Sequence, residues 1–406
     1  MNRTPYDVLV VGARCAGSPT AMLLARKGYR VLLVDKASFP SDTISTHLIH
    51  PPGVAALERW GLLERLVATG CPPIHTYLFD FGPFAISGSP AIPEAAFAYA
   101  PRRTVLDKLL IDAAREAGVE VREDFLVTEV VQEDGAVAGI RGHARGEETV
   151  TERARLVIGA DGLHSRIARA VGPEPYHEKA PILCGYYTYW RGLPMDGRFE
   201  TYVRPPRGWA AWPTHDDLTL LVVGWPYAEL EANRTDIEGN YLKSLERAPD
   251  FAARVRAATR VEPFAGMAVP NYFRKPFGPG WALVGDAGYN KDFITAQGIQ
   301  DAFRDAELCA RAVDETLRGE RPFAEAMGGY QAARDRHVGP MYEMTTELAR
   351  LEPPPPPLQR VLQALPGNQP AMDGFVRVQA GATSPAEFFT EENVGRILGA
   401  ALPLNP

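Results

Sequence analysis

A short apolar stretch near the N-terminus, followed at once by a glycine-containing turn, constrains the fold more than any other feature. Residues 7–11 are almost entirely apolar, which predicts a buried parallel strand. The turn Gly12-Ala13-Arg14-Cys15-Ala16-Gly17 follows, and apolar residues at helical spacing then continue to Gly28. A second apolar strand over 30–34 ends in Asp35. Strand, glycine turn, helix, strand and acid in this order predict a dinucleotide-binding βαβ unit.

The residue types of this turn suit a pyrophosphate group. Gly12 permits a tight turn, Gly17 lets the helix pack close to the strand, and the helix N-terminus presents free N–H groups. Asp35 is expected to accept hydrogen bonds from ribose hydroxyls. Arg14 stands where a second glycine is usual, so its side chain either points away from the ligand or adds positive charge to the phosphate site. The residues predicted to contact the dinucleotide here are Gly12, Ala13, Arg14, Ala16, Gly17, Asp35 and Lys36.

Two further strand-and-turn motifs lie far along the chain. Residues 156–160 form an apolar strand that leads into Asp161-Gly162, which alone would be an ordinary turn. Residues 281–284 form another, ending in Gly285-Asp286, and the stretch 295–299 then opens a long helix. A helix N-terminus offers N–H groups to an electron-rich carbonyl. Together the motifs indicate one ligand held from three distant parts of the chain.

With these motifs the chain resembles the single-component FAD-dependent monooxygenases of the aromatic-hydroxylase type, over roughly residues 5–345. The glycine loop, Asp35, Arg103 ahead of Leu106, Asp161-Gly162 and Gly285-Asp286 carry the resemblance. It implies FAD as cofactor and places further contacts at Arg103, Val127, Asp161, Gly285, Asp286, Gln297, Gly298 and Ile299. Geranylgeranyl-reductase-like and halogenase-like flavoproteins are more distant relatives. Phe293 and Thr295 depart from the proline and glycine common in the family, so the flavin ring is expected to sit differently.

The resemblance implies a monooxygenase that uses NADPH or NADH and O₂ to oxygenate a bulky aromatic or polyketide-like molecule through a flavin C4a-hydroperoxide. The absence of a second glycine fingerprint agrees with a nicotinamide donor that binds only transiently. A reductase of the geranylgeranyl-reductase type, acting on alkenes, is the main alternative, because residues 205–213 loosely match its substrate motif. A halogenase would need a Trp-x-Trp-x-Ile-Pro element and a pocket lysine, whereas Trp209 and Trp212 are three apart. A flavin-binding sensor without turnover is a third alternative.

The expected fold class is α/β: a Rossmann-like FAD-binding domain (1–179 and 276–345), a mostly antiparallel substrate-binding sheet (180–275), and a proline hinge with a small C-terminal helical cap (346–406). Aromatic alternation in the second segment predicts the antiparallel sheet, and the resemblance implies that this sheet forms one wall of the substrate pocket, although many of its aromatic side chains are simply core. His47, in a polar segment after Asp35, is a candidate catalytic base, with a structural role as the alternative. The candidate substrate residues are Tyr187, Tyr189, Tyr202, Trp209 and Trp212.

Composition excludes several other classes. A net charge of −7 and a pI of about 5.7 give no basic surface for nucleic acid. No apolar run is long enough to span a membrane, and no basic-then-apolar leader is visible, so a cytoplasmic protein is expected. Four scattered cysteines fit reduced thiols, and no ligand cluster predicts a metal. The expected partners are a small-molecule substrate and O₂, and a homodimer is possible.

Overall fold

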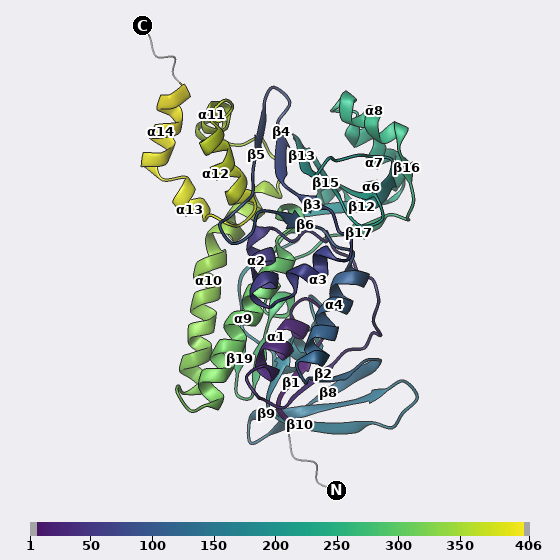
Figure 1. Ribbon diagram of the computed structural model, residues 1–406, viewed down its shortest axis with the longest axis vertical. Coiled ribbons are helices and arrows are strands. Elements are labelled where there is room, and N and C mark those ends of the chain that lie inside the picture. Colours follow the sequence, from purple (N-terminus) through teal and green to yellow (C-terminus); the bar gives the residue numbers. More distant parts are fainter. Residues whose placement is uncertain (1–5, 402–406) are drawn as a thin grey trace.

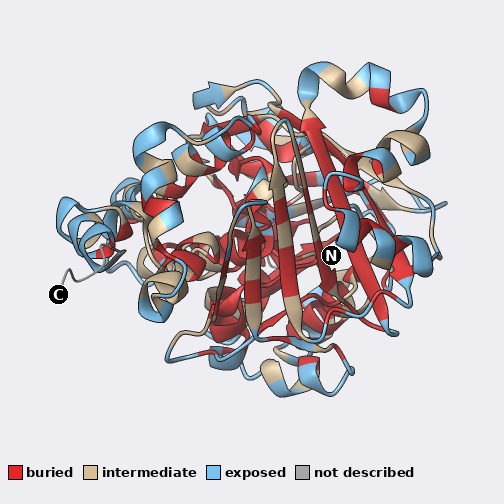
Figure 2. Cartoon of the chain, turned by 90° about the horizontal axis from the view of Figure 1, so that it is seen from above, coloured by how far each residue is buried: buried red, intermediate tan, exposed pale blue. Residues whose placement is uncertain are grey.

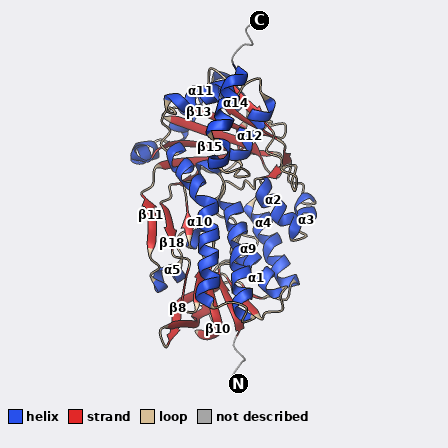
Figure 3. Cartoon of the chain, turned by 90° about the vertical axis from the view of Figure 1, so that its left-hand side faces the viewer, coloured by secondary structure: helices blue, strands red, loops and turns tan. Residues whose placement is uncertain are grey.

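The computed structural model describes residues 6–401. Two large β-sheets lie toward opposite ends of the molecule, and two long helices connect them (Figure 1). These helices are α9, Gly298–Leu317, and α10, Phe323–Leu348. Figure 3 shows both lying beside the first sheet and rising toward the second. The expected α/β architecture is therefore confirmed.

The first sheet has the order β19-β20-β10-β1-β2-β7, with β8 and β9 attached at β10. Helices α1, α2, α4 and α9 pack on one face, and β8, β9 and α5 cover the other, which explains why its strands are apolar throughout. The bounds are β1 Tyr6–Val11, β2 Val31–Val34, β7 Glu120–Arg122, β8 Phe125–Glu133, β9 Ala136–Ala144, β10 Val150–Gly159, β19 Phe277–Gly278, β20 Trp281–Leu283, α1 Gly17–Ala25, α2 Pro51–Arg59, α3 Leu63–Val67, α4 Arg103–Glu116 and α5 Arg166–Val171.

Parallel register brings the ends of the predicted strands to one edge of this sheet. Val11 of β1 lies opposite Gly159 of β10 and Val34 of β2, and Gly159 lies opposite Leu283 of β20. The turns that follow these strands therefore project from the same edge, which is where open α/β sheets bind ligands.

The second sheet has the order β16-β12-β15-β14-β13-β4-β5, and β17 also pairs with β12. All of its pairs are antiparallel except β13 with β4. The hairpin β4–β5 comes from residues 76–88, inside the segment assigned by sequence to the first domain, and sequence reasoning missed it. The bounds are β4 Thr76–Asp80, β5 Ala85–Gly88, β12 Leu183–Arg191, β13 Arg198–Arg204, β14 Arg207–Pro213, β15 Leu218–Pro226, β16 Thr259–Arg260 and β17 Ala265–Met267.

The two faces of this sheet are covered by different helices. The outer face packs against helices α7 and α8, together with the shorter η1 and α6. The inner face packs against α10 and the C-terminal helices. Seen from above, some strands of this sheet are buried along their length and others alternate buried and half-buried residues, while the helices around them expose one side (Figure 2). The strands β12 and β15 are buried almost throughout, and β13 and β14 alternate. The bounds are η1 Tyr227–Glu229, α6 Leu230–Arg234, α7 Ile237–Leu245 and α8 Pro249–Ala257.

The C-terminal segment forms four helices in the described residues. They are α11 Pro356–Ala364, α12 Gln369–Gln379, α13 Pro385–Phe388 and α14 Glu391–Ala401. The predicted proline hinge ends inside α11, because proline suits the first turn of a helix. The cap packs on β5, where Asp373 accepts a 2.9 Å hydrogen bond from Ser89 N. Across residues 6–401, no helix combines the length and apolar character needed to cross a membrane.

Candidate functional site

The turns after β1, β10 and β20 touch one another at glycines. A Cβ atom at Gly12, where φ is +101°, would lie 2.4 Å from the carbonyl oxygen of Ala160. A Cβ atom at Gly17 would lie 1.7 Å from the carbonyl oxygen of Gly12, and one at Gly285 would lie 2.9 Å from Ala16 Cβ. All three distances are too short for any side chain. The three motifs found far apart in the sequence therefore form one continuous backbone surface.

The N-terminus of α1 is available to an anion. Its N-cap residue, Ala16, makes no capping hydrogen bond, and the first turn holds no acidic residue. In this first turn Ser18 N donates to Arg14 O at 3.1 Å and Pro19 has no N–H, so Gly17 N is the donor of the turn left for an anion, together with the partial positive charge of the helix end. The glycine turn therefore fits a pyrophosphate, as the sequence predicted.

Asp35 holds the glycine turn from the side. Its two carboxylate oxygens accept hydrogen bonds from Ala13 N at 2.6 Å and Ala37 N at 2.8 Å. Burial raises the pKa of this carboxyl, and the two backbone donors oppose that effect. The neighbouring Lys36 is exposed. Contact of Asp35 or Lys36 with a ribose stays a prediction.

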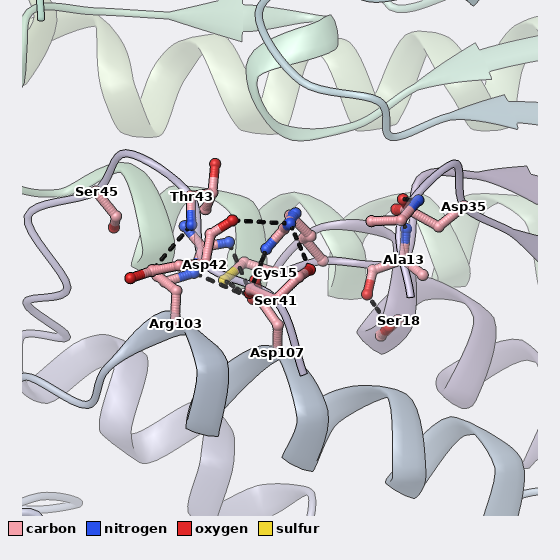
Figure 4. A network of polar contacts seen from close by, with 12 residues as sticks. Ala13, Cys15, Ser18, Asp35, Ser41, Asp42, Thr43, Ser45, Arg103 and Asp107 are labelled. Atoms are coloured by element: carbon pink, nitrogen blue, oxygen red, sulfur yellow. Dashed lines mark hydrogen bonds and ion pairs between the residues drawn. The ribbon is translucent and has the colours of Figure 1, made fainter. Parts of the chain in front are cut away.

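A buried carboxylate, Asp107 of α4, joins two arginines below the glycine turn (Figure 4). One oxygen accepts from Arg103 Nε at 3.1 Å and Nη2 at 2.9 Å, and from Cys15 Sγ at 3.4 Å. The other oxygen accepts from Arg14 Nη1. Two guanidinium groups sharing one carboxylate leave a net charge of about +1 next to the α1 N-terminus.

Arg14 points across to the polar segment after β2 rather than along the glycine turn. Its Nη2 donates to Ser41 Oγ at 3.0 Å and to Asp42 O at 3.3 Å, and Nη1 donates to Ser41 O at 3.3 Å. Arg103 differs, because its Nη1 donates no hydrogen bond to any residue in the described part of the chain. Arg14 therefore bonds to the segment after β2 and to Asp107, and its contact with a phosphate stays a prediction.

Asp286 and Gly298 mark the open side of an otherwise buried stretch. Between Trp281 and Gln300 they are the exposed residues, and nothing lies within 4 Å of a Cβ built on Gly298. Asp286 belongs to the 3₁₀ turn η2, Gly285–Ala287. The surrounding protein raises the pKa of its carboxyl to about 6, although the Arg103 guanidinium lowers it. A residue that is both crowded by protein and reached by solvent suits a hydroxyl-bearing ligand chain.

The N-terminus of α9 adds free N–H groups beside this opening. The N-cap residue Gln297 makes no capping bond; instead its amide donates to Gln379 O of the cap at 3.1 Å. Ala296 before it adopts a left-handed conformation with φ of +51°. Gln297 and Ile299 are buried, whereas Gly298 is open, which favours contact through backbone N–H groups.

Two predicted cofactor residues have sufficient structural roles of their own. Asp161 accepts from Ser165 Oγ at 2.5 Å and Arg166 N at 2.6 Å, and so caps helix α5. Val127 is buried in β8 beside the first sheet. Contact of either residue with the cofactor stays a prediction.

His47 is fully buried and conformationally unusual. Its φ is +61°, its Nε2 hydrogen-bonds with Tyr189 Oη, and its Nδ1 is buried without a hydrogen-bond partner in the described residues. Burial, followed by the positive charges of Arg103 and Arg102, holds the pKa of His47 well below its ordinary value. The imidazole is therefore neutral near pH 7 and has one unused nitrogen.

The predicted substrate wall divides between the two faces of the second sheet. Tyr187, Tyr189 and Trp212 lie on the inner face, near His47. Tyr187 Oη accepts from Ser45 N at 3.3 Å, and Trp212 Nε1 donates to Thr46 O at 3.2 Å.

Tyr202 and Trp209 lie on the outer face, where their rings stack at 5.3 Å and pack on Phe251 of α8. Side chains alternate between faces along a strand, so residues of opposite register cannot share one wall. Tyr202 and Trp209 therefore lie on the face away from His47, and contact of Tyr187, Tyr189 and Trp212 with a substrate stays a prediction.

Sequence reasoning missed Asp107 and Arg102, which organise this region. Arg102 binds Glu262 at 2.7 Å and Asp42 at 3.1 Å, and its guanidinium lies 4.1 Å from the Tyr189 ring centroid. The i,i+4 spacing of Arg103 and Asp107 on a predicted helix was the available indication. No group of residues suited to a metal ion occurs within residues 6–401, and Cys15, Cys71, Cys184 and Cys309 are buried free thiols.

Comparison with known proteins agrees with this geometry. A family model described as an FAD binding domain matches residues 5–344. Digeranylgeranylglycerophospholipid reductase 1 of Methanopyrus kandleri is 26% identical over 362 residues, covering 86% of this chain and 91% of the reductase. Kynurenine 3-monooxygenase of Salinispora arenicola is 26% identical over 375 residues, covering 85% and 80%. The solved structure of a myxobacterial chondrochloren halogenase superposes with a TM-score of 0.79 at 23% identity, over 98% of this chain and 97% of that one.

Proposed function

Because the chain belongs to the FAD binding domain family and is an FAD-dependent oxidoreductase, we propose that it is a monooxygenase using NADPH or NADH and O₂. Its proposed substrate is a bulky aromatic or polyketide-like molecule, oxygenated through a flavin C4a-hydroperoxide. Bound flavin supplies the hydride-accepting and oxygen-activating chemistry. The protein supplies binding, orientation and exclusion of water.

The residues present fit FAD from end to end. The N-terminus of α1, through Gly17 N and the helix dipole, and the net positive pair on Asp107 suit the pyrophosphate, with Arg103 Nη1 still able to donate. Asp286 would accept from the ribityl hydroxyls, and the N–H groups at Gly298 and Ile299 would face the pyrimidine carbonyl of the flavin. The single observation that carries the proposal is the meeting of three separate turns at Gly12, Gly17 and Gly285.

The substrate would bind on the inner face of the second sheet, near His47, Tyr187, Tyr189 and Trp212. His47 is neutral and its Nδ1 is unused, so it can accept a hydrogen bond from a phenolic hydroxyl of the substrate. The domain division proposed from the sequence fits this arrangement once the hairpin β4–β5 is added to the substrate sheet.

A reductase acting on alkenes is the second candidate, because the archaeal reductase is as similar to this chain as the bacterial monooxygenase, each at 26% identity. A halogenase fits less well. It would need a pocket lysine, and the buried lysine of the described chain, Lys291, is paired with Asp301.

The test is steady-state oxidation of NADPH and NADH by the purified FAD-loaded protein, with O₂ consumption followed in parallel during a screen of phenolic and polyketide compounds. The proposal predicts that one class of compound stimulates both rates and gains one oxygen atom by mass spectrometry. Stimulation by isoprenoid alkenes under anaerobic conditions, with gain of two hydrogens, would instead identify a reductase.

A further inference from the structure

A short strap crosses between the two sheets and is held at both of its ends. It comprises residues 41–47, between β2 and α2, and most of its side chains are exposed or half-buried. Its last residue is the fully buried His47. Figure 4 shows Ser41, Asp42 and Thr43 of the strap above Asp107 and beside Cys15.

At its first end the strap is bound by the side chains of Arg14 and Arg102, of which Arg14 makes most of the bonds. Both terminal nitrogens of Arg14 are used: Nη1 on Asp107 and Ser41 O, and Nη2 on Ser41 Oγ and Asp42 O. Arg102 adds a separate ion pair to the exposed carboxylate of Asp42. A guanidinium reaches these partners from two terminal nitrogens held in a rigid plane, whereas a lysine ammonium would have to reach all of them from one nitrogen.

At its second end the strap is bound by the inner face of the second sheet. Ser45 N donates to Tyr187 Oη, Thr46 O accepts from Trp212 Nε1, and His47 Nε2 bonds with Tyr189 Oη. These three bonds fix only residues 45–47, and residues 41 and 42 are fixed only by the bonds at the first end. The path of the strap therefore depends on the bonds at both ends.

We propose that Arg14 is a positioning residue, which fixes the strap so that His47 stays buried against Tyr189. Arg14, which stands at the usual second-glycine position, thereby connects the glycine turn through the strap to the second sheet. This inference rests on the proposed function, because that function places the substrate next to His47. The position of the strap can nevertheless be tested without measuring turnover.

The bonding pattern separates this role from direct phosphate binding. Arg14 has both terminal nitrogens committed to the strap and Asp107, whereas Arg103 Nη1 has no bond to any described residue. Arg103 is therefore the guanidinium left to meet an anion. Loss of Arg14 should disturb the strap far more than it disturbs FAD affinity.

The experiment is histidine footprinting with diethylpyrocarbonate on the FAD-saturated protein, read residue by residue by mass spectrometry. The variants are R14G, R14K and, as a matched control on α1, Arg26→Ala, which loses one bond to Trp60 O outside the strap. His50 is an internal control, because it is also buried and both of its nitrogens are bonded, to Tyr77 and Thr295. FAD dissociation constants are measured for every variant by flavin fluorescence.

In R14G, His47 should react about tenfold faster or more than in the wild type, since bonds from a charged group are lost. His50 should stay protected, and the FAD dissociation constant should change less than about threefold. R14K should be intermediate, because a lysine can keep the pair with Asp107 but not the bonds to Ser41 and Asp42. Arg26→Ala should match the wild type.

An unchanged His47 rate in both Arg14 variants would overturn the proposal. So would a large loss of FAD affinity with His47 still protected, which would make Arg14 a phosphate ligand. If R14G fails to fold, seen as rapid modification of His50, R14K alone decides, because faster reaction of His47 than of His50 is required. Failure of the protein to oxygenate any compound would contradict the proposed function and leave these outcomes unaffected.

Discussion

The Asp107→Ala substitution tests the charge arrangement beneath the glycine turn. Asp107 has no exposed surface, and it accepts hydrogen bonds from Arg14, from two nitrogens of Arg103, and from Cys15. The Arg103 side chain is only 9% exposed and the Arg14 side chain 25% exposed. Removing the carboxylate leaves two neighbouring positive charges without their counter-charge.

Breaking a buried ion pair by removing one partner costs about 3–5 kcal/mol, because the remaining charge is left unsolvated. The free energy of unfolding of FAD-free Asp107→Ala should therefore fall by about 4 kcal/mol. Asp112→Ala is the control on the same helix: its carboxylate is 29% exposed and pairs with Lys108 and Arg115. Such partly exposed pairs contribute about 1 kcal/mol or less.

The assay is urea unfolding followed by far-ultraviolet circular dichroism, with and without saturating FAD. If Arg103 faces the pyrophosphate, bound FAD replaces part of the lost negative charge, so the deficit of Asp107→Ala should narrow when FAD is present. Asp112→Ala should show the same small deficit in both conditions. A deficit in Asp107→Ala that is unchanged by FAD would refute the placement of the phosphates beside Arg103.

Three further substitutions test other parts of the site. Gly17→Ala should abolish FAD binding, measured as flavin per chain after gel filtration, because the added methyl group would lie 1.7 Å from Gly12 O. The control Gly328→Ala should bind FAD normally, because nothing lies within 4 Å of its added methyl group. Flavin retained by Gly17→Ala would contradict the close packing of this turn. Asp286→Ala should raise the FAD dissociation constant about tenfold by removing a charged acceptor, and an unchanged constant would withdraw Asp286 from the ribityl site. Burial raises the pKa of Asp292 to about 7, so folding takes up a proton between about pH 4 and 7 and wild-type stability falls as pH rises through that window. Asp292→Asn should remove about 2–3 kcal/mol of the difference in unfolding free energy between pH 5 and pH 8, and equal pH dependence in both proteins would contradict the assignment.

The first sheet and its ligand edge could be predicted because each strand carries its own local pattern. The apolar runs at 7–11, 30–34, 156–160 and 281–284 all became neighbouring parallel strands. The glycines were also informative, since Gly12 and Gly17 tolerate no side chain in the structure. Local periodicity and close backbone contact are properties that a sequence records directly.

The second sheet was harder, because the face a strand presents depends on its partners. Side chains alternate between the two faces of a strand, but the face on which each one lies follows only from the strand register. The register places Tyr187 and Tyr189 on one face and Tyr202 and Trp209 on the other. The hairpin over 76–88 was missed because it joins its sheet through a parallel pairing with β13, more than a hundred residues later in the chain. Asp107 looked like one more helix-surface acid, and only tertiary structure shows that it is buried between two arginines.

The central claim is that the bound flavin reacts with oxygen under the control of this site. The most direct measurement is rapid mixing of the anaerobically reduced, FAD-loaded protein with oxygenated buffer, and separately with an anaerobic geranylgeranyl alkene, while the flavin spectrum is recorded. The account predicts a transient species before oxidised flavin returns in the first experiment, and no reoxidation in the second. Reoxidation by the alkene, with no transient in oxygen, would contradict it and identify an alkene reductase.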